Sequence, residues 1–356
     1  MANLSESYSN RLAEGDRSRG ARRLGFALIV LLAVACMSGL AVGASDTSLW
    51  HALFDYVRGE DISRRDQIVL WDIRLPRVIM GCLVGAALAV SGAVLQGLFR
   101  NPLADPGIVG VSAGASLGAV VVIVLGGMLP FAALLGPWLI SVSAFVGAWS
   151  ATMVLYRIAT RRGCTSVATM LLAGIALAAL AMALTGVLVY LADDAQMRDF
   201  TFWNMGSLAG ASWSRLTIAV PLISLPLFLS PLLARGLNAL ALGEAAAGHL
   251  GLEVQRLKQG AILIVAGATG AAVAVSGGIG FVGIVVPHLL RLVNGPDHRY
   301  LLVNSALLGA ALLLLADLLS RTIIAPAELP IGIITAFVGG PFFLWILLRQ
   351  RSVVDL

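Results

Sequence analysis

The sequence predicts an all-α, polytopic membrane protein with about ten transmembrane helices and an internal inverted repeat. Of its 356 residues, 59% are hydrophobic and 12% are charged, whereas globular domains have about 45–50% and about 25%. The mean hydropathy of +0.92 excludes a disordered chain, a coiled coil, a collagen and an ordinary cytosolic enzyme, because each needs more polar surface or a stricter repeat. The apolar runs are continuous and do not alternate, so helices rather than a β-barrel must satisfy the backbone in lipid.

Windows of about 20 residues, enough to cross about 30 Å of hydrocarbon, mark the candidate spans. The first follows Arg22 and Arg23 and ends in small residues, as a cleaved secretory signal would. Its apolar run is longer than that of a signal peptide, so we expect a retained helix. The ten candidates are 24–44, 76–99, 107–126, 131–156, 167–191, 215–234, 258–276, 279–293, 300–320 and 331–348.

Basic side chains orient these spans. The chain has 24 basic and 19 acidic side chains, and Lys258 is the sole lysine. With ten spans and a cytoplasmic N-terminus, 16 of the 24 basic residues lie inside, which is the expected bias. We therefore expect a transmembrane domain at 24–348 between cytoplasmic tails at 1–23 and 349–356. Arginines scattered between apolar runs flank membrane spans, and we expect no binding to nucleic acid.

One apolar octapeptide occurs twice. Gly85–Gly92 in the second span recurs as Gly270–Gly277 in the seventh, with seven of eight positions identical. Chance is the alternative, because Ala and Gly are abundant here. The two copies lie five spans apart, so equivalent helices cross the membrane in opposite directions, as in many transporters. This predicts repeat halves at about 76–191 and 258–348.

Motifs for catalysis and metal binding give little support to an enzyme. Gly110–Gly114 fits the Gly-x-Ser-x-Gly pattern, and Ser112 with His288 could indicate an intramembrane serine protease, but that motif needs a preceding strand. A P-loop needs Gly-Lys-Ser or Gly-Lys-Thr, and Lys258 is followed by Gln259. Any ATP energy must therefore come from a partner. The three cysteines lack the Cys-x-x-Cys spacing and predict neither a disulfide framework nor a metal site: Cys36, Cys82 and Cys164.

Asp317 is the only acid well inside a predicted span. A buried acid in lipid is a functional candidate, and a secondary transporter driven by an ion gradient would need one. Arg321 lies four residues further on, so a local ion pair is the other interpretation. Both remain open from the sequence.

The inner segment from Leu237 to Gly251 is helical in pattern and rich in alanine around Glu244. It is either a solvated connector or a docking surface for an ATPase, since it is long and has an apolar side.

From about Ile73 to Leu348 the chain resembles the iron-siderophore, haem and vitamin B12 branch of bacterial ABC importer permeases. Several long motifs occur in the order of that family. They are Arg74–Arg77, Gly85–Gly92, Arg100–Gly107, Leu240–Glu244, Gly280–Gly283, Val286–His288 and Glu328–Gly332.

The resemblance implies a homodimeric permease of a type II importer in the bacterial inner membrane, surrounded by lipid. Two ATP-binding subunits would dock below it, and a periplasmic binding protein above it would deliver haem or a related iron chelate. No cofactor is expected on this chain, because ATP and Mg belong to the ATPase.

Arg74, Arg77 and Arg321 match the outer arginines with which the family holds glutamates on the binding protein. Arginine's planar fork suits that role. Snorkelling to the membrane interface is the alternative, since all three lie at span ends. There we expect them to face water and to contribute little to folding.

The resemblance also places two inner sites. The coupling segment at about 237–251 would seat in the ATPase through Leu240, Leu242, Gly243, Glu244, Ala245, Ala246, His249, Leu250 and Gly251. The inner gate would lie in the loop before the fifth span, at Thr165, Ser166, Val167, Ala168 and Thr169. The small hydroxyl residues usual at the gate's tip are shifted, and Val167 and Ala168 stand at the matching places.

The outer segment from Arg198 to Ser207 looks most like the haem-importing members. An interfacial aromatic belt is the other interpretation. We expect haem as the cargo, a ferric siderophore next and vitamin B12 last. The candidate pathway residues are Arg198, Phe202, Trp203 and Met205.

Overall fold

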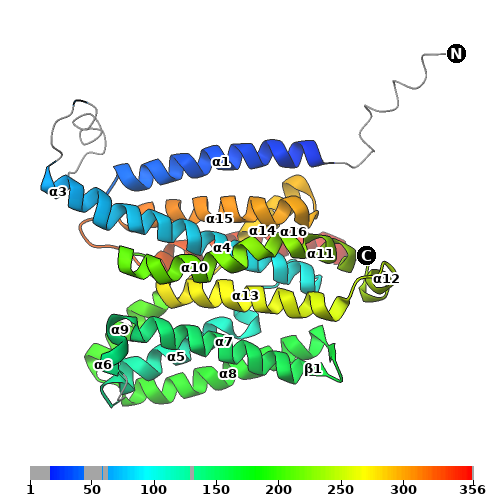
Figure 1. Cartoon of the computed structure of the whole chain (residues 1–356), viewed down its shortest axis with the longest axis horizontal. Helices are drawn as coiled ribbons and strands as arrows, with labels where there is room; N and C mark the ends of the chain where they lie inside the picture. The colour runs from blue at the N-terminus through cyan, green and yellow to red at the C-terminus, as the bar shows by residue number, and fades with distance from the viewer. Residues whose placement is uncertain (1–16, 44–57, 59–62, 129–131, 355–356) are drawn as a thin grey trace.

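The computed structural model describes residues 17–43, 58, 63–128 and 132–354, which form one bundle of helices running roughly side by side (Figure 1). Eight of the described helices or continuous helical stretches are long and apolar enough to cross a membrane. They are α1 (Ser18–Ala41), the stretch ending in α4 (Arg64–Phe99), α5 with its last turn (Val111–Met128), α7 with its first turn (Gly136–Ala159), α8 (Val167–Leu191), α10 and α11 (Trp213–Leu240), α13 (Val254–Ser276) and α15 (His298–Ser320).

Two shorter apolar helical stretches complete the set, α14 (Val282–Asn294) and the part of α16 (Ile331–Val354) that runs over Ile331–Ile346. The described helices thus match the ten predicted spans, and the all-α, polytopic fold is confirmed. The remaining elements are α3 (Arg64–Gln67), η1 (Ile68–Arg74), η2 (Pro106–Val109), η3 (Gly126–Met128), α6 (Ala132–Leu135), η4 (Gly136–Trp138), α9 (Asp194–Met205), η5 (Ser230–Leu233) and α12 (Glu244–His249).

Several boundaries differ from the prediction. The second span was predicted to begin at Pro76, but α3 and the π-helical η1 run without a break into α4 (Leu75–Phe99). Pro76 lacks an N–H and is tolerated at the first turn of α4, where the π-helix ends. The third span begins four residues late, at Val111, because the Asp105 carboxylate accepts from the Gly107 N–H at 2.8 Å and caps the short η2 turn first.

The coupling segment is not one helix. The α11 helix (Ala234–Leu240) ends in a turn, and Gly243 has φ of 106°, a backbone conformation that L side chains rarely adopt. The short α12 then runs from Glu244 to His249. An alanine-rich sequence is compatible with a continuous helix, so the pattern did not predict this break.

The centre of the bundle is α4 against α13, and most residues of both are buried. Glycines allow the closest approaches. A Cβ on Gly85 would meet the backbone of Gly309 in α15, and one on Gly92 would meet the backbone of Gly283 in α14. Leucine or valine at either position would force these helices apart.

The packing partners of α4 and α13 agree with an internal repeat in which equivalent helices lie five spans apart. In the first half α4 packs on α15 and α14, while in the second half α13 packs on α7 and α5. An inverted repeat requires this exchange, because α13 is the counterpart of α4, and α7 and α5 are the counterparts of α15 and α14. The boundaries of the two halves stay a prediction.

The bundle has two ends, visible in Figure 1. One carries α3, α6 and α9, and we call it the α9 end. The other carries the start of α1, α12 and the hairpin of β1 (Thr160–Arg161) and β2 (Cys164–Thr165), and we call it the α12 end. Arg162 and Gly163 form the hairpin's turn with φ of 51° and 77°, as a two-residue turn between twisted strands needs.

Candidate functional site

The three predicted docking arginines lie together at the α9 end, in a cluster with two acids. Arg77 of α4 donates from Nε to both Asp317 carboxylate oxygens at 3.0 and 3.1 Å, and from Nη2 to Oδ1 at 2.8 Å. It also donates to both oxygens of Glu328 at 2.9 Å. Arg321 approaches the same Asp317 carboxylate at 3.6 Å. We call these residues, with Arg74, the arginine cluster.

The arginines of the cluster and Asp317 are buried, whereas Glu328 is exposed, so the expectation that the arginines face water is wrong. Arg74, Arg77 and Arg321 are 3%, 6% and 5% exposed, and Asp317 is 1% exposed. Their position at span ends misled the prediction, since the end of α1 covers them. Carbonyl oxygens there accept from two of the arginines: Leu40 and Ala41 from Arg74, and Gly39 from Arg321.

Asp317 is therefore a structural ion-pair partner that ties α15 to α4. The local pair with Arg321 exists, but the bond to Arg77 is shorter and comes from 240 residues away in the sequence. Sequence reasoning missed Glu328 as a site residue, although its motif was noted. The cluster holds three positive and two negative charges, and Arg74 and Arg321 also donate to carbonyl oxygens.

The predicted coupling residues form the tip of the α12 end. Leu240 is 1% exposed and packs in the core, whereas Leu242 and Leu250 are 71% and 65% exposed. Glu244, Ala245, His249 and Gly251 are also exposed, and Gly243 and Ala246 are half-buried. An apolar surface at a helical tip suits contact with another protein.

The predicted gate residues follow the hairpin at this same end. Thr165 is buried in β2, and Ser166 caps α8 by accepting from the Thr169 N–H at 3.2 Å. Ala168 and Thr169 are exposed, and Val167 is half-buried.

Lys258 of α13 joins the coupling and gate regions. Its ammonium donates to the Thr165 carbonyl at 2.7 Å and to Glu244 at 2.8 Å. The Thr165 N–H in turn donates to the Gln255 side chain at 2.9 Å. Nothing in the sequence pointed to this junction except that Lys258 is the sole lysine in a chain whose other basic residues are arginines.

The candidate pathway residues lie on α9, which a capping box of Asp193 and Gln196 begins. Phe202 is 57% exposed, and Trp203 packs partly against the core. Both line a cavity of about 220 Å³ with Arg215, which sequence reasoning missed. Two predicted residues do not line this cavity: the exposed Arg198 and the half-buried Met205.

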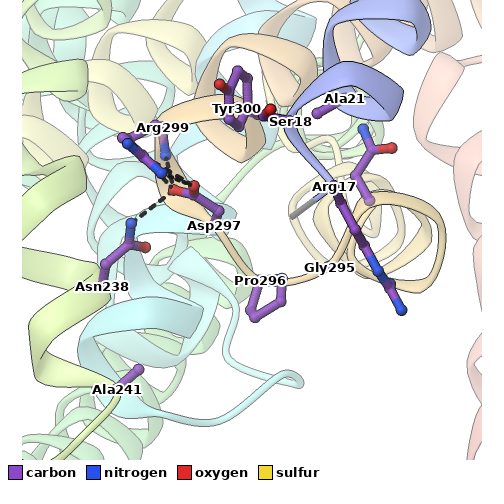
Figure 2. A pocket seen from close by; sticks show the side chains of 11 residues that line it. Arg17, Ser18, Ala21, Asn238, Ala241, Gly295, Pro296, Asp297, Arg299 and Tyr300 are labelled. Carbon is purple, nitrogen blue, oxygen red and sulfur yellow. Dashed lines mark hydrogen bonds and ion pairs between the residues drawn. The ribbon is translucent and has the colours of Figure 1, made fainter. Parts of the chain in front are cut away.

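A larger cavity of about 550 Å³ opens at the α12 end between the start of α1, α11 and the loop before α15. Figure 2 shows Asp297 there, bound by Arg299 at 2.7 Å and by Asn238 at 2.7 Å. The Arg299 guanidinium lowers the pKa of Asp297 to about 2. Asp297 also caps α15 by accepting from the Arg299 N–H at 3.0 Å.

Catalytic and metal constellations have no support in the described ranges. Ser112 lies in the first turn of α5, a helix, and not after a strand. His288 packs edge-on against Phe342, with ring centroids 6.2 Å apart. Among the residues described, no three His, Cys, Asp or Glu side chains gather to hold a metal. Cys36 and Cys82 do approach each other as free thiols, with sulfurs at a hydrogen-bonding distance of 3.7 Å.

Comparison with known proteins gives matches along nearly the whole chain. The FecCD transport family matches residues 30–349. The chain is 48% identical to the hemin transport system permease protein HmuU of Yersinia pestis, covering 92% of this chain and 96% of that protein. It is 46% identical to the cobalamin import system permease protein BtuC of Halobacterium salinarum, covering 81% and 75%.

Vitamin B12 permeases and a solved transporter also match. The identity to the vitamin B12 import system permease protein BtuC of Shigella boydii is 41%, covering 91% and 94%. A solved structure, described as an inward-facing conformation of a metal-chelate type ABC transporter, has a TM-score of 0.79 at 31% identity, covering 94% of this chain and 100% of that chain.

Proposed function

The chain belongs to the FecCD transport family, and from this premise we propose that it is the transmembrane permease subunit of a type II ABC importer that moves haem. The observation that carries the haem assignment is the 48% identity to a hemin permease over 92% of this chain. The outer helix α9 supports it. Arg198 can attract carboxylates and Phe202 can stack on a planar ring, and haem has both features.

The energy comes from partner subunits. The only lysine is followed by Gln259 and not by the serine or threonine of a P-loop, so the chain itself performs no ATP hydrolysis by that route. Two ATP-binding subunits with ATP and Mg would dock on the tip formed by α12. A homodimer of the chain in the bacterial inner membrane, with both termini cytoplasmic, would receive cargo from a periplasmic binding protein at the α9 end.

Vitamin B12 is the second candidate cargo, because a cobalamin permease is 46% identical over 81% of this chain. A ferric siderophore is the third. An ion-coupled secondary transporter is less favoured, since the Asp317 carboxylate is already bound by Arg77 and approached by Arg321.

Uptake by proteoliposomes tests the proposal. The chain is reconstituted with its ATPase and binding protein, and ATP-dependent uptake of haem, cobalamin and a ferric siderophore is measured in parallel. We expect haem uptake that stops without ATP or without the ATPase. Uptake of cobalamin alone would reassign the cargo, and uptake driven by an ion gradient without ATPase would overturn the ABC assignment.

A further inference from the structure

The ammonium of Lys258 lies between the two predicted inner sites. We propose that Lys258 is a positioning residue that transmits movement of α12 to the gate segment at 165–169. This inference rests on the proposed function, because it assumes that α12 seats in an ATPase and that this segment closes the pathway.

The contacts of Lys258 are short, and its side chain is buried while that of Glu244 is 43% exposed. Lys258 is 1% exposed, and its ammonium binds both Glu244 carboxylate oxygens at 2.8 Å and the Thr165 carbonyl at 2.7 Å. A buried ammonium without these acceptors would be strongly destabilising. Displacing Glu244 or Thr165 alone is therefore costly, and the two groups are expected to move together.

A lysine suits this junction better than an arginine. The ammonium is a compact charge with three donors that can point at acceptors in separate directions, whereas guanidinium donors lie in one plane. The carboxylate comes from α12 and the carbonyl from β2, so the acceptors belong to different segments.

Glycines with positive φ lie next to α12. Gly243 and Gly251, with φ of 106° and 80°, lie on either side of α12, and such glycines accommodate backbone rotation. Thr165 directly precedes Ser166, the residue that caps α8. A shift of α12 therefore reaches the first turn of α8 through one side chain.

The variant that tests this coupling is Lys258→Met, which removes the ammonium and keeps the apolar volume. Glu244, a predicted contact with the ATPase, stays in place, and its side chain is 43% exposed, so water can solvate the carboxylate that loses its partner. Folding and ATPase binding are therefore expected to persist. The matched control is Arg256→Met, which removes an ion pair of the same helix end whose side chains are 80% and 62% exposed.

Transport stoichiometry gives the first measurement. In proteoliposomes with ATPase and binding protein, we expect the Lys258→Met variant to hydrolyse ATP while the uptake per ATP falls about tenfold. The control should match the wild type. Equal loss of uptake and hydrolysis, with weaker ATPase binding, would show a purely structural role and overturn the inference.

Cys164 gives a second, direct measurement, because it is exposed and precedes Thr165. In a Cys36→Ser, Cys82→Ser background, the rate of thiol labelling at Cys164 is compared with and without ATP and vanadate. We expect the rate to change in the control and to stay constant in the Lys258→Met variant. A nucleotide-dependent change in both would overturn the inference. If the labelling rate of Cys164 in the wild type changes with nucleotide but the wild type shows no ATP-dependent uptake, the result counts against the proposed function instead.

Discussion

At the scale of single residues, the structure places its charged side chains where they bridge helices. Arg77 and Asp317 are both almost fully buried and come from α4 and α15. The sequence identified Asp317 as an unusual acid and its neighbour Arg321 as a partner. It could not identify the shorter bond to Arg77, because nothing local specifies a contact across 240 residues.

Removing either Arg77 or Asp317 alone should destabilise the protein far more than removing both. We expect Arg77→Met to destabilise the protein by about 3–5 kcal/mol, because it leaves the Asp317 carboxylate buried without its main partner. The Arg77→Met, Asp317→Leu double variant should be closer to the wild type than either single variant. Thermal unfolding in detergent measures this, and additive losses would show that the two side chains do not depend on each other.

Asp297 predicts a pH dependence with a defined sign. Its folded pKa of about 2 lies below the unfolded value of about 3.9. Its stabilising contribution is therefore complete above about pH 4 and is lost as the pH falls toward about 2.

The Asp297→Ala variant should melt lower than the wild type at neutral pH, since an N-cap is worth about 1 kcal/mol. We expect this difference in melting temperature to shrink below about pH 4. Asp297→Asn keeps an acceptor for the cap and serves as the uncharged control. A difference that stays constant down to about pH 2 would contradict the role of the Arg299 pair.

At the scale of elements, hydrophobic pattern predicted the helices well and their ends poorly. The fifth span was expected at 167–191, and α8 is Val167–Leu191. Length and apolarity decide where lipid-facing helices run, so the pattern suffices there. Caps, turns and positive φ decide where helices stop, and the break at Gly243 left no trace in an alanine-rich pattern.

Close helix packing predicts that replacing two different helix glycines with alanine has opposite effects on stability. Gly92→Ala should destabilise by about 1–3 kcal/mol, because its Cβ would meet the backbone carbonyl of Gly283, which cannot move aside easily. Gly260→Ala is the control, since Leu233 lies at an ordinary 3.6 Å and helix propensity favours alanine by up to about 1 kcal/mol. Equal melting temperatures for the two variants would contradict the packing of α4 on α14.

At the scale of the whole molecule, the sequence predicted candidate functional segments but not how they connect. The gate and the coupling segment were predicted separately, and the structure joins these two segments through Lys258. The three arginines predicted for docking lie together at one end, but they are buried rather than exposed, and their docking role stays a prediction. Burial depends on α1 covering them, and no local pattern encodes that contact.

The formal charge of the five residues in the arginine cluster is positive, which gives the last prediction. Reversing all three arginines would now be expected to disrupt folding, because it would put acids beside the buried Asp317. Arg74→Gln with Arg321→Gln is a sharper test. Each glutamine keeps an N–H donor, while the formal charge of the cluster changes from positive to negative.

We expect this double variant to bind the binding protein about tenfold more weakly at low salt, with a smaller loss at high salt, since interface charges act through a screened field. Its melting temperature should fall only slightly. The matched control is Arg64→Gln with Arg65→Gln, two exposed arginines of α3 at the same end. There we expect a slower association rate and an unchanged dissociation rate, because exposed charges mainly steer encounter. If the Arg74 and Arg321 variant binds the binding protein with unchanged affinity, these arginines only hold helices together, and the binding protein docks elsewhere at the α9 end.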